Sequence, residues 1–274
     1  MAALRVGFVG LGNIGKPMAL QLAAAEAVDL QVYDVAPDPV AELVAAGATA
    51  VGSIAEIDAE VVCVMVRDDE QVRDVADALR QAQGPRGPVL VVHSTVAPST
   101  PADLAASGRR VLDAPVSGGP MGAADGSLAI MVGGDEDAFA TARPALEAMG
   151  TRVVHAGPLG SGTRMKLARN LIHFVAFTAV TEAQRLAEAA GLDLVALGEV
   201  VRHTDAITGG PGAIMHRATA APIAADDFWH GVFSHVAALG EKDLGFAVAL
   251  ADELGVDVPL AREALPRLRK GLGT

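Results

Sequence analysis

The chain has 274 residues, of which 51% are apolar and only 3% aromatic, and its 21 basic and 33 acidic side chains give a net charge of −12. This composition excludes a disordered chain, and the length suffices to bury one large core or two modest ones. The acidic balance excludes a general nucleic-acid binder, and a single cysteine, Cys63, excludes an internal disulfide or a cysteine-rich zinc site.

The first half of the chain alternates short apolar runs with helical patterns. Runs rich in valine, isoleucine and leucine predict seven strands, at residues 4–9, 30–33, 61–66, 89–93, 111–113, 128–132 and 151–155. Amphipathic or alanine-rich segments predict helices between them, at residues 14–25, 39–46, 70–81, 101–106 and 136–149. Aliphatic strands that alternate with helices are typical of a parallel sheet covered on both faces.

The second half of the chain is helical in pattern. A loop rich in glycine and proline at 156–163 precedes a helical pattern that runs from about 164 to 190, which is long for a globular protein. Further helices are predicted at 193–202, 234–254 and 259–271, and no convincing strand follows residue 156. We therefore predict a sheet-based domain at 1–160 and an all-helical domain at 161–274.

The sequence also predicts where the protein resides. Its most apolar stretch, residues 171–180, contains His173 and Thr178 and is too short to span a membrane. The N-terminus reaches a glycine-rich turn within ten residues and has no apolar signal-peptide segment. We expect a soluble protein of the cytoplasm, with no membrane or nucleic-acid partner and no bound metal.

A glycine-rich turn follows the first predicted strand. Residues 5–15 read RVGFVGLGNIG, so Gly10, Gly12 and Gly15 lie between a strand and a helix with the spacing GxGxxG. In dinucleotide-binding folds these glycines make the tight turn, admit the pyrophosphate and let the helix pack close to the strand. The expected cofactor-binding residues of this turn are Gly10, Leu11, Gly12, Asn13, Ile14 and Gly15. We therefore predict an α/β Rossmann-type N-terminal domain, joined by a long interdomain helix to an all-α C-terminal domain.

An acidic residue bears on the choice of cofactor. Asp34 ends the second predicted strand, 19 residues after Gly15. A carboxylate there can accept hydrogen bonds from the ribose hydroxyls and repels a 2′-phosphate, so NAD is favoured over NADP. The alternative is that Asp34 only caps the following turn. We also assign Val66, at the end of the strand predicted at 61–66, to the cofactor site.

Two polar residues share one face at the start of the long helix. Lys166 and Asn170 are four residues apart, and the helix N-terminus lowers the proton affinity of a lysine placed near it. A lysine that acts as a base near neutral pH needs such a lowered proton affinity. For a lysine with only a structural role, a place near the helix N-terminus is unfavourable. The alternative is a solvated surface lysine.

Three further motifs are candidates for ligand contact. Ser117, Gly118 and Gly119 end the segment DAPVSGG, where consecutive backbone N–H groups can hold a carboxylate or simply form a turn. The segment HSTVAP at 93–98, which contains Thr95, follows a predicted strand, where ligands of α/β folds collect, although it can equally cap the next helix. Lys242 and Asp243 form a charged pair in an apolar helical run and can be a solvated pair.

Together these motifs resemble the β-hydroxyacid dehydrogenase family, which includes 3-hydroxyisobutyrate dehydrogenase and tartronate semialdehyde reductase. The similar segments, in the same order along the chain, are GLGNIGKPMA (10–19), HSTVAP (93–98), DAPVSGGPMGAADGSLAIMVGG (113–134), GSGTRMKLARN (160–170) and EKDLGFA (241–247). The resemblance implies a homodimer or homotetramer built through the helical domain.

The resemblance also implies roles for individual residues. The catalytic lysine of the family corresponds to Lys166, and its substrate-orienting asparagine corresponds to Asn170. Its carboxylate-binding turn corresponds to Ser117, Gly118 and Gly119. Thr95 and Lys242 correspond to positions that lie along the cofactor near the nicotinamide.

The chain departs from the family pattern at positions that bear on the substrate. His93 stands where an aspartate is usual, and the proline often found near Arg67 is missing. His235, eight residues before Asp243, replaces a common phenylalanine that lies close to the substrate. A histidine there can donate a hydrogen bond or become cationic, which predicts a substrate with an additional polar or acidic group. The alternative places His235 in helical packing or a subunit interface.

The predicted activity is hydride transfer between NAD(H) and a small 3-hydroxy acid or its semialdehyde. Lys166 would take the alcohol proton during oxidation and return it during reduction, and the Ser117 turn would hold the substrate carboxylate. An imine reductase has a similar architecture but generally lacks the lysine. A non-catalytic NAD-binding module could keep the glycines but would not need Lys166.

Overall fold

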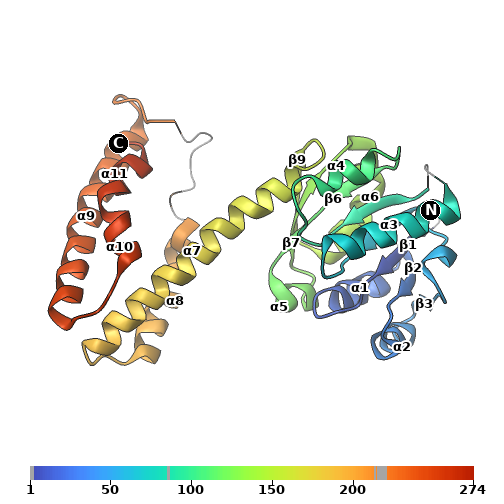
Figure 1. The fold of residues 1–274 in the computed structure, drawn as a ribbon, viewed down its shortest axis with the longest axis horizontal. Coiled ribbons are helices and arrows are strands. Elements are labelled where there is room, and N and C mark those ends of the chain that lie inside the picture. Colours follow the sequence, from blue (N-terminus) through green and yellow to red (C-terminus); the bar gives the residue numbers. More distant parts are fainter. Residues whose placement is uncertain (1–2, 85–86, 213, 215–220) are drawn as a thin grey trace. The chain divides into compact units, whose positions relative to one another are not determined.

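The structure, a computed structural model, describes residues 3–84, 87–212, 214 and 221–274. The chain forms two compact units, Met1–Arg169 and Asn170–Thr274 (Figure 1). The first unit is built on a sheet and the second is helical. This agrees with the predicted fold class.

The sheet of the first unit runs in the order β3-β2-β1-β4-β5-β6-β8-β7, with β9 paired to β8. Its strands are β1 (Leu4–Val9), β2 (Val28–Tyr33), β3 (Thr49–Ala50), β4 (Val61–Val64), β5 (Val89–Val92), β6 (Val111–Asp113), β7 (Val116–Ser117), β8 (Ala129–Gly133) and β9 (Arg152–Gly157). The pairs from β3 to β6 are parallel, and β1 lies between β2 and β4. The carboxyl ends of β1, β2 and β4 therefore meet at one edge, where a ligand of this fold binds.

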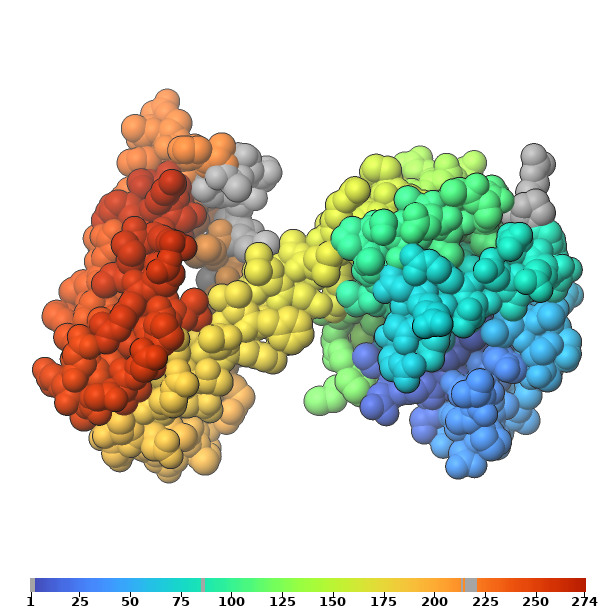
Figure 2. Space-filling model, in the orientation of Figure 1, coloured from blue at the N-terminus to red at the C-terminus, as the bar shows by residue number. Residues whose placement is uncertain are grey.

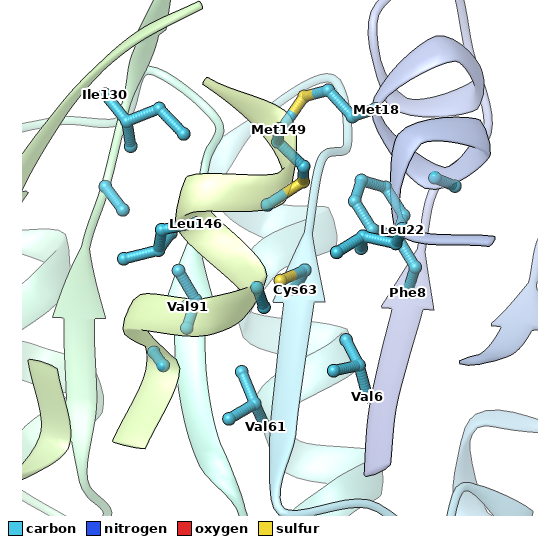
Figure 3. Packing of buried hydrophobic residues seen from close by; sticks show 14 of the residues in the cluster. Val6, Phe8, Met18, Leu22, Val61, Cys63, Val91, Ile130, Leu146 and Met149 are labelled. Atoms are coloured by element: carbon cyan, nitrogen blue, oxygen red, sulfur yellow. The ribbon is translucent and has the colours of Figure 1, made fainter. Parts of the chain in front are cut away.

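Helices cover both faces of this sheet, as the aliphatic strands predict. The helices of the first unit are α1 (Gly15–Ala24), α2 (Pro37–Ala45), α3 (Asp69–Gln83), α4 (Thr100–Ala105), α5 (Gly119–Ala124) and α6 (Glu136–Met149), with a 3-10 turn η1 (Ile54–Glu56). Alternate strand residues face opposite sides, because side chains alternate along a strand. Val61 and Cys63 of β4 pack with α1 and α6 (Figure 3), whereas Val62 and Val64 pack on the side of α3.

Cys63 lies in the middle of this core. Its side chain is fully buried, and burial raises the pKa of its thiol to about 12. The thiol is therefore protonated at neutral pH and packs as a small apolar group.

Local signals explain where the helices begin and end. The carboxylate of Asp68 accepts a hydrogen bond from the N–H of Gln71 and caps α3, which ends before Gly84 at a positive φ of 77°. Val72 and Leu79 are among the α3 residues that recur on one face and are buried, so the helix packs against the sheet along that face.

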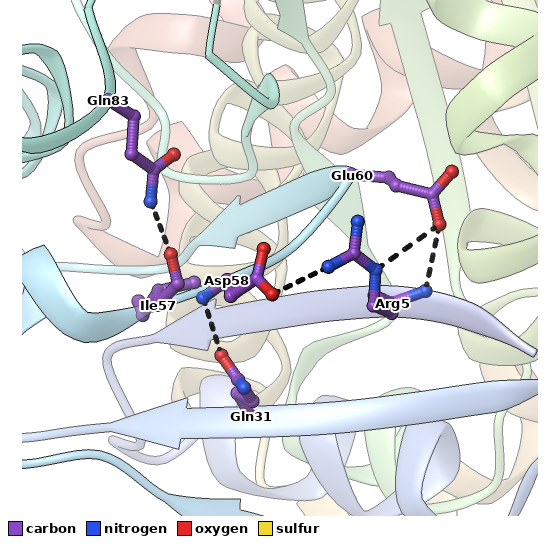
Figure 4. A network of polar contacts seen from close by, with 6 residues as sticks. All are labelled: Arg5, Gln31, Ile57, Asp58, Glu60 and Gln83. Carbon is purple, nitrogen blue, oxygen red and sulfur yellow. Dashed lines mark hydrogen bonds and ion pairs between the residues drawn. The ribbon is translucent and has the colours of Figure 1, made fainter.

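A polar network links β1 and β2 to the loop before β4 and to the end of α3 (Figure 4). Arg5 of β1 pairs with Asp58 at 2.7 Å, and the backbone N–H of Asp58 donates to Gln31 of β2 at 2.8 Å. The side-chain amide of Gln83, at the end of α3, donates to the carbonyl oxygen of Ile57. These largely exposed contacts fix the course of the loop that leads into β4 more than they add to stability.

Several details of the first unit differ from the prediction. The strand at 129–133, β8, pairs antiparallel with β6 and β7 and parallel with β9, so the prediction of a parallel sheet is wrong for the pairs of β8 with β6 and β7. A parallel connection usually crosses over through a full helix, whereas the connection from β7 to β8 contains only the six-residue α5. The short strands β3 and β7 and the helix α5 were not predicted, because two-residue strands carry no periodic signal.

One long helix, α7 (Ser161–Ala189), begins in the first unit and continues into the second. The other helices of the second unit are α8 (Leu194–Thr208), α9 (Phe228–Leu254), α10 (Pro259–Ala264) and α11 (Leu268–Leu272), with 3-10 turns η2 (Gly210–Gly212) and η3 (Leu265–Arg267). The predicted helix at 259–271 is therefore interrupted. Across the described residues, no helix combines the length and the apolar character needed to cross a membrane.

Candidate active site

A cavity of about 610 Å³ opens at the carboxyl ends of β1, β2 and β4. Of the predicted cofactor-binding residues, it is lined by Gly10, Gly12, Asn13, Ile14, Gly15, Asp34 and Val66. The structure therefore brings the glycine turn, the end of β2 and the end of β4 around one space. Tyr33, Ile54, Gln71 and Asp74 also line it and were not predicted.

The three glycines of the turn have different surroundings. A Cβ on Gly10 would collide with the carbonyl oxygen of Met65, and one on Gly15 would collide with the carbonyl oxygen of Gly10. These two glycines therefore allow β1, β4 and α1 to approach closely. A Cβ on Gly12 would meet nothing within 4 Å, so the missing side chain there leaves open space beside the backbone. This arrangement suits a pyrophosphate group at the start of α1.

Asp34 holds the glycine turn as well as lining the cavity. One carboxylate oxygen accepts the N–H of Leu11 at 2.5 Å, and the other accepts the N–H of Ala36 at 2.8 Å. The predicted turn cap therefore exists. Each carboxylate oxygen has a second lone pair, so both remain able to accept a ribose hydroxyl.

The HSTVAP segment is anchored to the same edge through Ser94. Its hydroxyl donates to the carbonyl oxygen of Val66 at 2.7 Å and accepts the N–H of Val66 at 2.9 Å. Thr95 is exposed and follows directly. The segment thus holds Val66, which lines the cavity, in place through Ser94. Ser94 was not among the predicted site residues.

His93 lies beneath this segment and is 1% exposed. Its Nδ1 donates to the carbonyl oxygen of Ala114 at 2.8 Å, and its ring stacks near Phe8. Burial lowers the pKa of its imidazole to about 4, although the Ala114 carbonyl acts in the opposite direction. Its Nε2 has no hydrogen-bond partner among the described residues. His93 is therefore neutral at pH 7.

Lys166 folds back onto the strand that precedes the Ser117 turn. Its Nζ donates to the carbonyl oxygen of Val116 at 2.7 Å, and the residue is 9% exposed. Burial lowers the pKa of the ammonium, and the charge of Arg169 lowers it further. Gly118 and Gly119 have positive φ angles of 136° and 63°. The structure therefore brings the candidate lysine and the candidate carboxylate-binding turn together.

A buried carboxylate explains why the first turn of α7 lies there. Asp113, at the end of β6, is fully buried and accepts the N–H of Gly160 at 2.7 Å and that of Thr163 at 2.6 Å. A Cβ on Gly162 would collide with the carbonyl oxygens of Met131 and Asp113. The start of the helix that carries Lys166 is thus pinned directly to the sheet. Asp113 was not predicted as a site residue, because its partners lie some 50 residues away.

The remaining predicted residues belong to the second unit. Asn170 follows Lys166 by one turn of α7 and is partly buried. His235 and Lys242 lie seven residues apart on α9 and therefore on the same face of that helix. Both are exposed, and Lys242 pairs with Asp243 at 3.1 Å, so the charged pair predicted as the alternative is present.

Sequence comparisons identify relatives over nearly the whole chain. Residues 5–157 match the NAD binding domain of 6-phosphogluconate dehydrogenase, and residues 160–271 match the NAD-binding domain of NADP-dependent 3-hydroxyisobutyrate dehydrogenase. A 3-hydroxyisobutyrate dehydrogenase of Pseudomonas aeruginosa is 36% identical over 93% of this chain and 88% of its own length. The chain belongs to the β-hydroxyacid dehydrogenase family.

Other members of this family are also similar. An uncharacterised oxidoreductase of Mycobacterium tuberculosis is 47% identical, with 98% of this chain and 93% of the relative covered. An NAD-dependent L-serine dehydrogenase of P. aeruginosa is 36% identical, with 95% and 85% covered. The chain is thus an oxidoreductase of the 3-hydroxyisobutyrate dehydrogenase type, with NAD(P)-binding domains.

Solved structures agree with this assignment. A putative oxidoreductase from Mycobacterium avium has a TM-score of 0.94 at 46% identity, with 98% of this chain and 99% of that chain covered. A 3-hydroxyisobutyrate dehydrogenase of M. tuberculosis, solved with L-serine, has a TM-score of 0.68 at 32% identity, with 98% and 93% covered. An imine reductase from Myxococcus stipitatus, in complex with NAD+, has a TM-score of 0.76 at 18% identity, with 100% and 96% covered, which shows the shared fold alone.

Proposed function

We propose that this dehydrogenase transfers a hydride between NAD(H) and a small 3-hydroxy acid or its semialdehyde, with Lys166 as the proton donor and acceptor. The observation that carries the proposal is the 2.7 Å contact of Lys166 Nζ with Val116, directly before the Ser117 turn. The same unit contains the cavity with the glycine turn.

The roles follow from the chemistry of these groups. When bound, the nicotinamide accepts or supplies the hydride. The backbone N–H groups of Ser117, Gly118 and Gly119 hold the substrate carboxylate, which orients the hydroxyl-bearing carbon. Lys166 takes the hydroxyl proton during oxidation and donates it to the alkoxide oxygen during reduction.

Burial makes Lys166 suited to this role. A lysine with its ordinary pKa of about 10.4 would be almost fully protonated near neutral pH, and the lowered pKa increases the fraction that can accept a proton. Asn170, one turn further along α7, would orient the substrate or the lysine amine. Thr95 and Lys242 would lie along the cofactor near the nicotinamide, a role that rests on the family resemblance.

We propose NAD rather than NADP as the preferred cofactor. Asp34 places a carboxylate in the cavity with a free lone pair on each oxygen, which suits the ribose hydroxyls and repels a 2′-phosphate. Arg67 also lines the cavity, but its guanidinium pairs with Asp68 at 3.0 Å. This exposed pair weakens the attraction of Arg67 for that phosphate without removing its charge.

The activity is tested by incubating the full chain with small 3-hydroxy acids and either NAD+ or NADP+. Absorbance of the reduced nicotinamide should appear with NAD+ and 3-hydroxyisobutyrate, L-serine or glycerate. The reverse assay uses the corresponding semialdehydes and NADH. An absence of turnover with every acid and semialdehyde would contradict the proposed function.

His235 gives a finer hypothesis about the substrate. Its exposed ring, on the same face of α9 as Lys242, can donate a hydrogen bond to an additional polar or acidic group. The variant His235→Phe should then raise the efficiency with 3-hydroxyisobutyrate relative to glycerate. An unchanged ratio, with unchanged thermal stability, would leave His235 without a role in substrate choice.

We further propose a homodimer or homotetramer that forms through the second unit. Large apolar side chains of its helices are exposed, including Phe174 at 59% and Phe228 at 75%, and such surfaces commonly bind a partner. Light scattering of the full chain tests this, and a monomer at micromolar concentration would contradict it.

The proposed domain division is 1–160 and 161–274. The two family matches end at residue 157 and begin at residue 160, which supports it. A cytoplasmic location is also proposed, because the single cysteine fits a reducing compartment.

A further inference from the structure

A buried histidine outside the proposed proton-transfer step contacts the segment that carries the substrate turn. His93 directly follows β5, and its Nδ1 donates to the carbonyl oxygen of Ala114 at 2.8 Å. Its ring stacks near Phe8, on the face of the sheet covered by α1 and α6, whereas α3 and α4, turquoise to green in Figure 2, cover the other face. Only 1% of the residue is exposed, so a bound substrate does not reach the ring. Any role of His93 in the reaction must therefore act through Ala114.

Ala114 lies in the segment that positions the candidate catalytic groups. Directly before it, Asp113 accepts two backbone N–H groups at the start of α7. Two residues after it, the carbonyl oxygen of Val116 accepts a hydrogen bond from the Nζ of Lys166 at 2.7 Å, and the proposed carboxylate-binding turn begins at Ser117. A displacement of Ala114 would therefore move the acceptor of Lys166 and the turn together.

Both polar backbone groups of Ala114 are bound at the end of β5. Its N–H donates to the carbonyl oxygen of Val92 at 2.8 Å, and its carbonyl oxygen accepts the Nδ1–H of His93. Ala114 is fully buried, so water does not reach this carbonyl, and Pro115, which follows, has no N–H to continue the hydrogen bonds of the sheet. The imidazole thus pairs a carbonyl oxygen that would otherwise be a buried acceptor without a partner.

The next residue connects His93 to the cofactor cavity. The hydroxyl of Ser94 donates to the carbonyl oxygen of Val66 at 2.7 Å and accepts its N–H at 2.9 Å, and Val66 lines the cavity. Two consecutive side chains therefore hold two parts of the site, one at the cavity wall and one at the segment that binds Lys166. All of these residues belong to the first unit.

We propose that His93 is a positioning residue whose hydrogen bond to Ala114 fixes Lys166 and the substrate turn relative to the cofactor cavity. The inference rests on the proposed function, because it assigns His93 to the same reaction. The lowered pKa of the imidazole keeps the ring neutral, and the Ala114 carbonyl holds its single proton on Nδ1, which makes the ring a donor of fixed direction. Hydride transfer depends steeply on the placement of the reacting atoms, and an error of about 1 Å can lower the rate about a hundredfold.

The test compares two replacements of His93 in the full chain. His93→Phe keeps a ring but removes the donor, so kcat/KM for the best 3-hydroxy acid should fall about ten- to a hundredfold, while the Kd for NADH, measured by fluorescence, changes less than about twofold. His93→Asn places an amide N–H₂ near the position of Nδ1, so it should keep kcat/KM within about threefold of the wild type, although the smaller side chain lowers the melting temperature. A residue that only packs in the core would show the reverse order, with asparagine the more harmful replacement.

His155→Phe is the matched control. The Nε2 of His155, on β9, binds the carbonyl oxygen of Gly134 at 2.9 Å, and its ring stacks on Phe139. The variant removes the same kind of contact between an imidazole and a backbone carbonyl, but that carbonyl lies outside the segment that binds Lys166. It should change kcat/KM less than about twofold.

Hydrogen–deuterium exchange measured by mass spectrometry gives a readout that needs no turnover. Peptides that cover residues 113–121 should exchange about fivefold faster in His93→Phe, and at the wild-type rate in His93→Asn and His155→Phe. If His93→Phe does not fold, His93→Leu, which also lacks the donor, takes its place with the same expectations.

The outcomes separate this inference from the proposed function. Faster exchange in His93→Phe, with no turnover by any variant or by the wild type, would support the link through His93 and contradict the proposed function. Turnover by the wild type with an unchanged kcat/KM in His93→Phe would overturn the role of His93. Unchanged exchange of residues 113–121, or an equal loss of kcat/KM in His93→Asn and His93→Phe, would overturn it as well.

Discussion

The two units of the molecule bury apolar surface in different ways. The first unit packs helices on both faces of a sheet, and all the largest fully buried side chains, from Phe8 to Met149, belong to it. In the second unit the buried cluster consists of Phe233, Ala237 and Leu272, with partly buried neighbours around it. A covered sheet can complete its core within one chain, whereas long helices leave an apolar side unless another surface covers it.

Both units nevertheless use the same device to fix a helix. Asp113 in the first unit holds the start of α7, and Glu182 in the second accepts the N–H groups of Leu260 and Ala261 at 2.8 and 3.0 Å and holds the start of α10. Each carboxylate is buried and accepts two backbone N–H groups. A single buried acid can therefore position a helix in either environment.

The largest expected effect is a loss of turnover, and it should follow a lysine of the first unit and not one of the second. Lys166→Ala should lower turnover by about 10²–10⁴-fold, because it removes the proton-transfer group, while NADH binding measured by fluorescence changes only a few-fold. Lys242→Ala, in the second unit, should act mainly on the KM for NAD. Lys270→Ala is the control and should leave both unchanged. Activity of Lys166→Ala within a few-fold of the wild type would refute the assignment.

The next effect concerns the two buried carboxylates. Asp113→Asn should lower the free energy of unfolding by about 3 kcal/mol and Glu182→Gln by about 1–3 kcal/mol, since an amide N–H₂ would face a buried backbone N–H. Calorimetric melting of the full chain measures both. Asp193→Asn, an exposed cap of α8, should change little because asparagine caps as well as aspartate. Losses no larger than that of the control would contradict the anchoring role.

Stability should also depend on pH through His93. Its pKa of about 4 in the folded state lies below the unfolded value of about 6.5, so the unfolded state binds more protons between these pH values. Stability should therefore fall as the pH decreases from 6.5 to 4, by about 3 kcal/mol at most. His93→Gln removes this term, so urea melts of the two proteins should show a difference that varies with pH. A difference in the free energy of unfolding that stays constant between about pH 4 and pH 6.5 would refute this contribution of His93.

The smallest effect is on cofactor choice, which the first unit should decide. Asp34→Ser combined with Val35→Arg should lower the NAD-to-NADP ratio of kcat/KM by about ten- to a hundredfold, because a repelling carboxylate is replaced by a phosphate-binding cation. Val35 is 90% exposed, so the arginine does not disturb the core. Val35→Arg alone should shift the ratio less. A wild-type protein that already prefers NADP would contradict the role given to Asp34.

Much of the first unit could be predicted from its sequence. The bounds of β1, β6 and α6 agree with the prediction, because aliphatic runs and a helical period are strong local signals. The glycine turn and Asp34 were expected to share a site, since parallel strands end at one edge, and they line one cavity. The antiparallel β8 could not be predicted, because strand direction depends on how β7 pairs with it.

The site was predicted less completely, for a physical reason. Lys166 and Ser117 were proposed from separate motifs, and their proximity depends on Asp113, whose partners Gly160 and Thr163 are 47 and 50 residues away. Such long-range hydrogen bonds leave no periodic signal. The link through His93 was likewise missed, because it depends on Ala114, 21 residues further along the chain.

The reactivity of the Cys63 thiol can report on opening of the first unit. It is the chain's only cysteine, and a buried thiol with a pKa of about 12 does not react with maleimides or aromatic disulfides, which attack the thiolate. An unfolded chain exposes a thiol with an ordinary pKa of about 8.5, which reacts readily. The rate of labelling therefore reports how often the sheet opens. Because the helical unit contains no cysteine, fluctuations confined to that unit do not contribute to the rate.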